Sequence, residues 1–157
     1  MATTPTTSGR ATIQADGTKF DAISTSVTFN SLKDHTGQPV MGSLTTDIKV
    51  YVDIQDDGNV PFGTLQTLFN KANKPSKDKL TQFKITFWKD EEKQNAICTY
   101  TFNGWISSFT TANPLPVSVP GSNGTDTSPY STVNHLLVLD LVPVLNTANS
   151  SSVVLGN

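Results

Sequence analysis

The residues best able to act as a nucleophile and a general base are Cys98, the single cysteine, and His135. Catalysis by such a pair needs the base within hydrogen-bond reach of the thiol and a third group that orients the base. Cys98 alternates with Tyr100 and Phe102 on the apolar side of an expected strand, where cysteine usually packs as a small hydrophobe. No orienting Asp or Asn can be identified for His135. We therefore expect packing roles for both residues, no catalytic residue and no enzymatic activity.

Carboxylates cluster at Asp53, Asp56 and Asp57, which Gly58 and Asn59 follow. A calcium loop would place its ligands at alternating positions and end on a glutamate, and this run does neither. A turn that leads into a helix explains the residues better. The sequence also lacks a glycine-rich phosphate loop and the Cys/His spacing of a metal site. It therefore predicts no cofactor and no metal.

The length, charge and cysteine content of the chain argue against nucleic acid and membranes as partners. The chain has 157 residues, a net charge of −2 and no basic cluster, so we expect one domain that does not bind nucleic acid. No apolar run approaches the ~18 residues that span a bilayer. The first residues, MATTPTTSGR, have no apolar core, and a single cysteine does not require an oxidising compartment. We expect the protein to fold in the cytosol.

The largest source of apolar surface is the stretch from Phe83 to Phe109, which holds both tryptophans, Trp88 and Trp105. Apolar and polar residues alternate along its two arms, the period-two pattern of half-buried strands. The polar segment KDEEKQN between the arms predicts a hairpin turn. Gly104 lies just before Trp105, where we expect a bulge to shift the phase of the second strand.

A second hairpin is expected at the start of the domain. Ala11–Ala15 and Lys19–Ile23 flank Asp16-Gly17, a pair typical of a type I′ turn. The alternation continues to Asn30, with an irregularity near residues 24–26.

One helix is expected from the spacing of apolar residues after Asn59. Asn59 is the expected cap, Pro61 suits the first turn, and the apolar residues follow a period of 3.6. We expect three of them to cover the outer face of a barrel: Phe62, Leu65 and Phe69.

Two later strands complete the expected β-structure, over Leu44–Ile54 and Val133–Val144. The second is apolar on both faces, as in a strand that protein covers on both sides. About six or seven strands and one helix indicate a mainly β protein, a small antiparallel β-barrel or sandwich with one flanking α-helix. We expect this domain at 10–145, between a flexible arm at 1–9 and a tail at 146–157.

Several segments, taken in order, carry a resemblance to a known family: Ala11–Phe29, DHTGQP (Asp34–Pro39), Phe62–Phe69, FKITFWKDE, GWISSFTT (Gly104–Thr111) and HLLVLDLVPV. They resemble the hemolysin-coregulated protein (Hcp) family, the inner-tube subunits of type VI secretion systems, and its short Bacteroidetes-type members most. The resemblance implies a β-barrel flanked by one helix, hexameric rings, and a stacked tube. It also implies cytoplasmic assembly inside a contractile sheath, with spike and effector proteins as partners, and export on contraction without a signal peptide.

The segment 113–129 is longer than the corresponding loop of that family, and the arm and the tail are additional. These departures leave open whether the chain belongs to type VI secretion or to a related, phage-like contractile system.

The segment Ser31–Ser43 is long for a connection between strands, and ordered loops of this length are usually functional or interfacial. We expect it to project from one end of the barrel and to contact the next ring. Its apolar residues have little reason to be exposed in a monomer, and polar residues beside them are expected to fix the register of stacking. The expected contact residues are Lys33, Asp34, His35, Pro39, Val40 and Met41.

A monomeric β-sandwich that binds carbohydrate is the alternative function. Trp88 or Trp105 would then serve as a stacking platform for a sugar ring. The other interpretation of both tryptophans is packing in the core or in an interface.

Overall fold

The computed structural model describes residues 11–74, 76–112, 135–144 and 154–156. In these ranges the chain forms one antiparallel sheet in the order β2-β1-β5-β6-β7-β4-β3, with β8 paired to β6. The arm at 1–9, the segment 113–129 and most of the tail at 146–157 lie outside the described residues. The elements are β1 (Ala11–Ala15), β2 (Thr18–Ala22), β3 (Ser24–Asn30), β4 (Thr45–Asp53), α1 (Phe62–Ala72), a short 3₁₀ helix (Lys77–Lys79), β5 (Thr81–Trp88), β6 (Ala96–Ala112), β7 (Leu136–Pro143) and β8 (Val154–Gly156).

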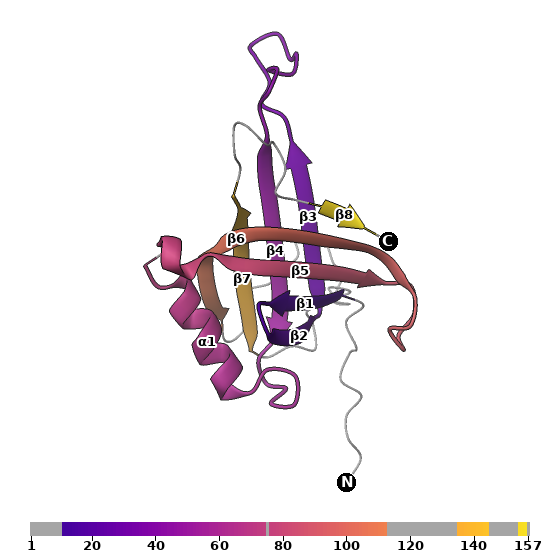
Figure 1. Cartoon of the computed structure of the whole chain (residues 1–157), viewed down its shortest axis with the longest axis vertical. Helices are drawn as coiled ribbons and strands as arrows, with labels where there is room; N and C mark the ends of the chain where they lie inside the picture. Colours follow the sequence, from indigo (N-terminus) through magenta and orange to yellow (C-terminus); the bar gives the residue numbers. More distant parts are fainter. Residues whose placement is uncertain (1–10, 75, 113–134, 145–153, 157) are drawn as a thin grey trace, which may run out of the picture.

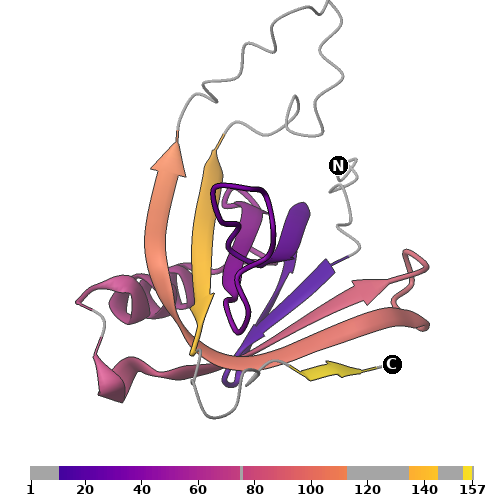
Figure 2. The same cartoon turned by 90° about the horizontal axis from the view of Figure 1, so that it is seen from above.

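Strand β6 joins two layers. Its 17 residues pair with β5 from Ala96 to Gly104 and with β7 from Gly104 to Ala112. Figure 1 shows β1, β2 and β5 crossing β3, β4 and β7 at a steep angle, and Figure 2 shows β6 curving strongly between its halves. The result is a barrel-like sandwich of two crossed layers, open between the edge strands β2 and β3. The predicted fold class, mainly β with one flanking helix, is confirmed.

The core lies between the two layers. Alternation along each strand turns one face inward, as the sequence pattern predicts. Phe83 and Phe102, from the two arms of the central hairpin, are buried with their ring centroids 5.5 Å apart. The largest other fully buried side chains are Ile13, Ile48, Val50, Val52, Leu68, Ile85, Ile106, Leu137, Leu139 and Leu141.

Gly104 lies where β6 passes from one layer to the other. A Cβ at this position would be 2.3 Å from the carbonyl oxygen of Val142, so only glycine lets β7 approach this closely. The bulge predicted here lies slightly further along, because the β6–β7 register shifts between Ile106 and Ser108. The glycine therefore serves close packing, and the irregularity that helps β6 to curve follows it.

The first hairpin forms as predicted, but its turn is not type I′. That turn needs a positive φ at both central residues, and of the pair only Asp16 has one, at 52°. The irregularity expected near residues 24–26 is a break at Ile23, whose amide donates to the carbonyl of Tyr51 over 2.9 Å. There the chain leaves the layer of β1 and continues as β3 beside β4.

Strand β7 is less enclosed than its apolar sequence suggests. Leu137, Leu139 and Leu141 are buried in the core, whereas Val142 on the opposite face is 40% exposed. The expectation that protein covers both faces is therefore wrong at this end of the strand. Val133 and Asn134, the first residues of the predicted strand, lie outside the described residues.

Candidate functional site

The loop between β3 and β4 has a defined shape. Lys33 and Pro39 form an isolated antiparallel bridge, and the amide of Val40 donates to the carbonyl of Leu32 over 2.7 Å. In Figure 1 the loop extends beyond the ends of β3 and β4 at the top of the view. Its predicted projection from one end of the barrel agrees with this view.

Asp34 organises this loop from within. Its Oδ1 accepts hydrogen bonds from the Thr36 hydroxyl (2.6 Å), the Thr36 amide (2.8 Å) and the Gln38 amide (3.0 Å). These bonds hold the pKa of the exposed Asp34 carboxyl below its usual 3.8. The largest contribution is the hydrogen bond from the Thr36 hydroxyl, followed by those from the backbone amides of Gln38 and Thr36. Gly37, with φ of 85°, completes the turn. Asp34 therefore fixes the turn of the loop from Ser31 to Ser43.

Apolar side chains of the loop are open to solvent. Met41 is 88% exposed, Leu32 54% and Val40 43%, while Lys33, His35 and Pro39 are also exposed. The Asp34 bonds and the bond between Val40 and Leu32 hold the backbone that carries this apolar group, so that binding would cost little backbone entropy.

Helix α1 packs mainly through Leu68, and two of the three residues predicted to cover the barrel, Leu65 and Phe69, also contact it. Leu68 is fully buried, and Leu65 is partly buried against the core. Phe69 is half exposed and its ring meets Phe109 of β6 edge-on, with centroids 5.5 Å apart. Phe62 is 76% exposed, so its predicted role in covering the barrel is wrong. Phe62 is the first residue of the helix, where the helix does not yet lie against the sheet.

Asn59 does not cap the helix as predicted. Pro61 is the N-cap residue and makes no side-chain cap bond. The Asn59 side chain instead binds the open edge of β2, accepting from the Asp21 amide (2.7 Å) and donating to the Asp21 carbonyl (2.8 Å). This pair of bonds replaces the strand neighbour that β2 lacks at its outer edge.

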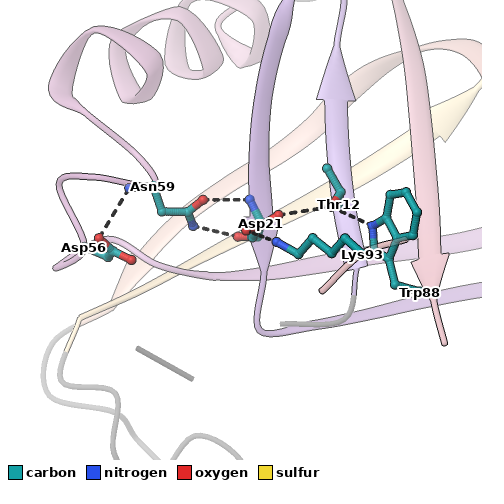
Figure 3. Close-up of polar contacts among 6 residues, drawn as sticks. All are labelled: Thr12, Asp21, Asp56, Asn59, Trp88 and Lys93. Carbon is teal, nitrogen blue, oxygen red and sulfur yellow. Dashed lines mark hydrogen bonds and ion pairs between the residues drawn. The ribbon is translucent and has the colours of Figure 1, made fainter. Parts of the chain in front are cut away.

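Asp21 is the centre of a polar network that the sequence did not reveal (Figure 3). Thr12 donates to Asp21 Oδ1 over 3.0 Å, the indole N–H of Trp88 donates to Thr12 Oγ1 over 2.9 Å, and Lys93 forms an ion pair with Asp21. The strand alternation places Thr12 and Asp21 side by side. Their partners are far along the chain, Trp88 at the end of β5 and Asn59 and Lys93 in connecting segments, and no local pattern predicts them.

Cys98 and His135 do not come together. Cys98 is near the start of β6, opposite Phe87, whereas His135 precedes Leu136, which pairs with Ala112 at the other end of β6. At about 3.3 Å per strand residue, this separation far exceeds the roughly 3 Å reach of a nucleophile–base hydrogen bond. These two residues cannot form a catalytic pair.

The acidic run forms a turn, as predicted. Asp53 accepts a hydrogen bond from the Gln55 amide, and Asp56 accepts from the amides of Gly58 and Asn59. The described part of the chain contains no group of three or more His, Cys, Asp or Glu residues arranged to hold a metal ion.

The outer side of β2, β1, β5 and β6 is hollowed. Two adjoining hollows of about 320 and 300 Å³ share Gln14 and Lys84. The other tryptophan, Trp105, lies elsewhere and donates its indole N–H to the carbonyl of Ser76. We call the hollowed surface the polar face, and its residues are Thr12, Gln14, Asp16, Lys19, Gln82, Lys84, Thr86, Trp88, Ala96, Thr99 and Thr101.

The fold and these surfaces define a mainly β protein with one flanking helix, a projecting loop and a hollowed polar face. Among solved structures, the chain is similar to Hcp1 from Flavobacterium johnsoniae, with a TM-score of 0.53. The alignment covers 85% of this chain and 89% of that one, at 9% identity. No protein-family model matches the sequence, and no curated protein matches it.

At this identity the similarity establishes a shared fold, and the Hcp-like fold expected from the sequence is confirmed. No helix in the described ranges is long and apolar enough to cross a membrane.

Proposed function

We propose that this protein is a structural subunit of the inner tube of a type VI secretion system or a related contractile injection system. The observation that carries the proposal is the fold shared with Hcp1 over 85% of the chain. The subunits would form hexameric rings that stack into a hollow tube, as the family resemblance implies. The role is structural, without an enzymatic activity.

The projecting loop supports such an assembly. A tube subunit needs two heterologous interfaces, one within the ring and one along the axis. The exposed apolar group around Met41 offers an axial contact, and the open edge of β3, with the part of the β2 edge that Asn59 does not cover, offers backbone groups for contacts within the ring.

In this proposal the tube assembles in the cytoplasm inside a contractile sheath. Contraction then exports it, with spike and effector proteins, without a signal peptide.

Native mass spectrometry and negative-stain microscopy of the purified protein test the proposal. A tube subunit gives rings or filaments with a mass several times that of the 16.9 kDa chain. A protein that stays monomeric at every concentration, with no ring in the images, would overturn the proposal and favour a monomeric binding module.

A further inference from the structure

The polar face carries a row of side chains that four strands bring together. The register places Lys19 beside Gln14, Gln14 beside Lys84, and Lys84 beside Thr101. The adjoining row, which the hollow near Trp88 includes, holds Thr12, Thr86 and Thr99. Thr12 and Thr86 are buried, and the Thr12 hydroxyl is already bonded to Asp21 and Trp88, so Thr99 is the accessible hydroxyl of this row. Each hollow is at the lower end of the roughly 300–1,000 Å³ of small-molecule sites.

The charge of this face is positive although the chain as a whole carries −2. Asp16 lines one hollow and Asp21 lies beside Thr12, and both carboxylates are already paired, Asp16 with Lys71 and Asp21 with Lys93. Lys19 and Lys84 are exposed and form no ion pair with any residue that the structure describes. The two lysines therefore attract an anion to the centre of the hollows.

Trp88 gives the face a fixed aromatic wall. Its indole N–H is held by Thr12 at 2.9 Å, and its ring lines the hollow that also contains Lys19 and Lys84. A fixed indole offers a flat apolar surface at little conformational cost. In the neighbouring row, the side-chain amide of Gln14 donates to the carbonyl of Asp16, and its amide oxygen lies between Lys19 and Lys84 without a hydrogen bond from a described residue.

We propose that the polar face binds an acidic oligosaccharide of the uronic-acid type. The sugar carboxylates would pair with Lys19 and Lys84, its hydroxyls would bond to Gln14, Thr99 and Thr101, and one sugar ring would stack on Trp88. Two free lysines are too few for a nucleic-acid backbone, whose affinity grows with the number of phosphates neutralised. The accessible neutral groups, on Gln14, Gln82, Thr99 and Thr101, suit the hydroxyls of a sugar better than they suit the carboxylates of an acidic peptide. The inference is independent of tube assembly, because ligand binding and ring formation are measured separately.

The test is a calorimetric titration of the full-length protein with tetragalacturonate at low salt, with neutral maltotetraose as the matched sugar. Polyglutamate and oligothymidylate serve as probes that carry negative charge without sugar hydroxyls in the same arrangement. Of the four probes, we expect only tetragalacturonate to bind. Lys84→Gln and Lys19→Gln should each lower its affinity about fivefold, since each variant removes one exposed charge pair. Trp88→Phe should weaken binding and abolish a ligand-induced change in tryptophan fluorescence.

Matched controls are Lys77→Gln, an exposed lysine outside the polar face, and Trp105→Phe, whose indole N–H is also hydrogen-bonded. Neither should change the affinity. Thermal unfolding of each variant shows whether it is folded, and the lysine changes at exposed positions should leave it so.

The proposal is overturned if tetragalacturonate does not bind at its highest soluble concentration, or if maltotetraose binds as well. Equal or tighter binding of polyglutamate or oligothymidylate overturns it in favour of a surface that responds to charge alone. Equal losses in the variants and their controls would place the binding elsewhere on the protein. None of these results depends on whether rings form.

Discussion

Asp16 shows how one carboxylate connects three elements. Its Oδ2 receives a hydrogen bond from Lys71 of α1 over 2.8 Å, and its Oδ1 accepts from the amide of Gln82 at the start of β5. Its own backbone amide donates to the Gln82 carbonyl. The turn between β1 and β2 is thereby attached to both the helix and the next strand.

Replacing Asp16 with alanine should lower the free energy of unfolding by about 1–3 kcal/mol. The loss combines the missing bonds with the strain of placing alanine at a φ of 52°. The half-exposed ion pair itself contributes little of this, so Asp16→Asn, which tolerates this backbone conformation, should cost clearly less. Urea unfolding at neutral pH measures both variants, and equal losses would contradict the role of the backbone.

Stability should fall in acid partly through Asp16. The hydrogen bond from Lys71 is the main cause that holds the pKa of Asp16 below its usual 3.8. A lowered pKa means that the carboxylate adds stability above about pH 4, and that this gain is lost as the pH falls through the folded-state pKa. Urea unfolding from about pH 7 to about pH 3 should therefore show a smaller decrease for Asp16→Asn than for the unchanged protein. Parallel curves would contradict this assignment.

At the scale of elements, α1 is held by fewer residues than its apolar period suggests. Leu68 is fully buried, while Phe62 on the same apolar pattern is largely exposed. Leu68→Ala should cost about 2–5 kcal/mol because it leaves a cavity against the sheet. Phe62→Ala should change stability by less than about 0.5 kcal/mol. Chemical unfolding compares them, and similar losses would mean that the helix packs through its first turn.

The contact between β6 and β7 depends on Gly104. Gly104→Ala should destabilise the protein by more than about 2 kcal/mol, because the new methyl group meets a backbone carbonyl that cannot move independently. Gly63→Ala in the helix is the matched control, since nothing lies within 4 Å of the position. It should stabilise by about 0.5–1 kcal/mol. Thermal unfolding distinguishes the two, and a stable Gly104→Ala variant would contradict the close approach.

The sequence predicted the elements whose signals are local. The alternation around Phe83 and the period of α1 gave the correct element types, because burial of one face imposes those periods. The roles of Asn59 and Asp21 could not be predicted. The two residues bond to each other across 38 residues of sequence, and the short polar side chain that suits a helix cap also suits the edge of a strand. For Phe62, periodicity identified an apolar face but not where along the helix the sheet begins to cover it.

At the scale of the whole molecule, the loop from Ser31 to Ser43 has exposed apolar side chains that would have no role in a monomer. It is held in shape by Asp34, yet it exposes Met41 and Val40 at one end of the molecule. Within the proposed tube, this position suits contacts along the axis, whereas the open strand edges suit contacts around the ring. The two interfaces should then be separable by mutation.

Shortening Lys33–Met41 to a glycine-containing turn should leave rings intact and abolish long stacks, as scored by microscopy at matched protein concentration. The double variant Val40→Ser and Met41→Ser keeps the length and the Asp34 bonds of the loop while removing its exposed apolar surface. It should also shorten the stacks if apolar contact along the axis is what holds them. Tubes of normal length in both variants would show that the loop is not the axial contact, and the segment 113–129 would become the candidate. Loss of the rings themselves would mean that the loop contributes to the contact around the ring, and that the two interfaces are not separate.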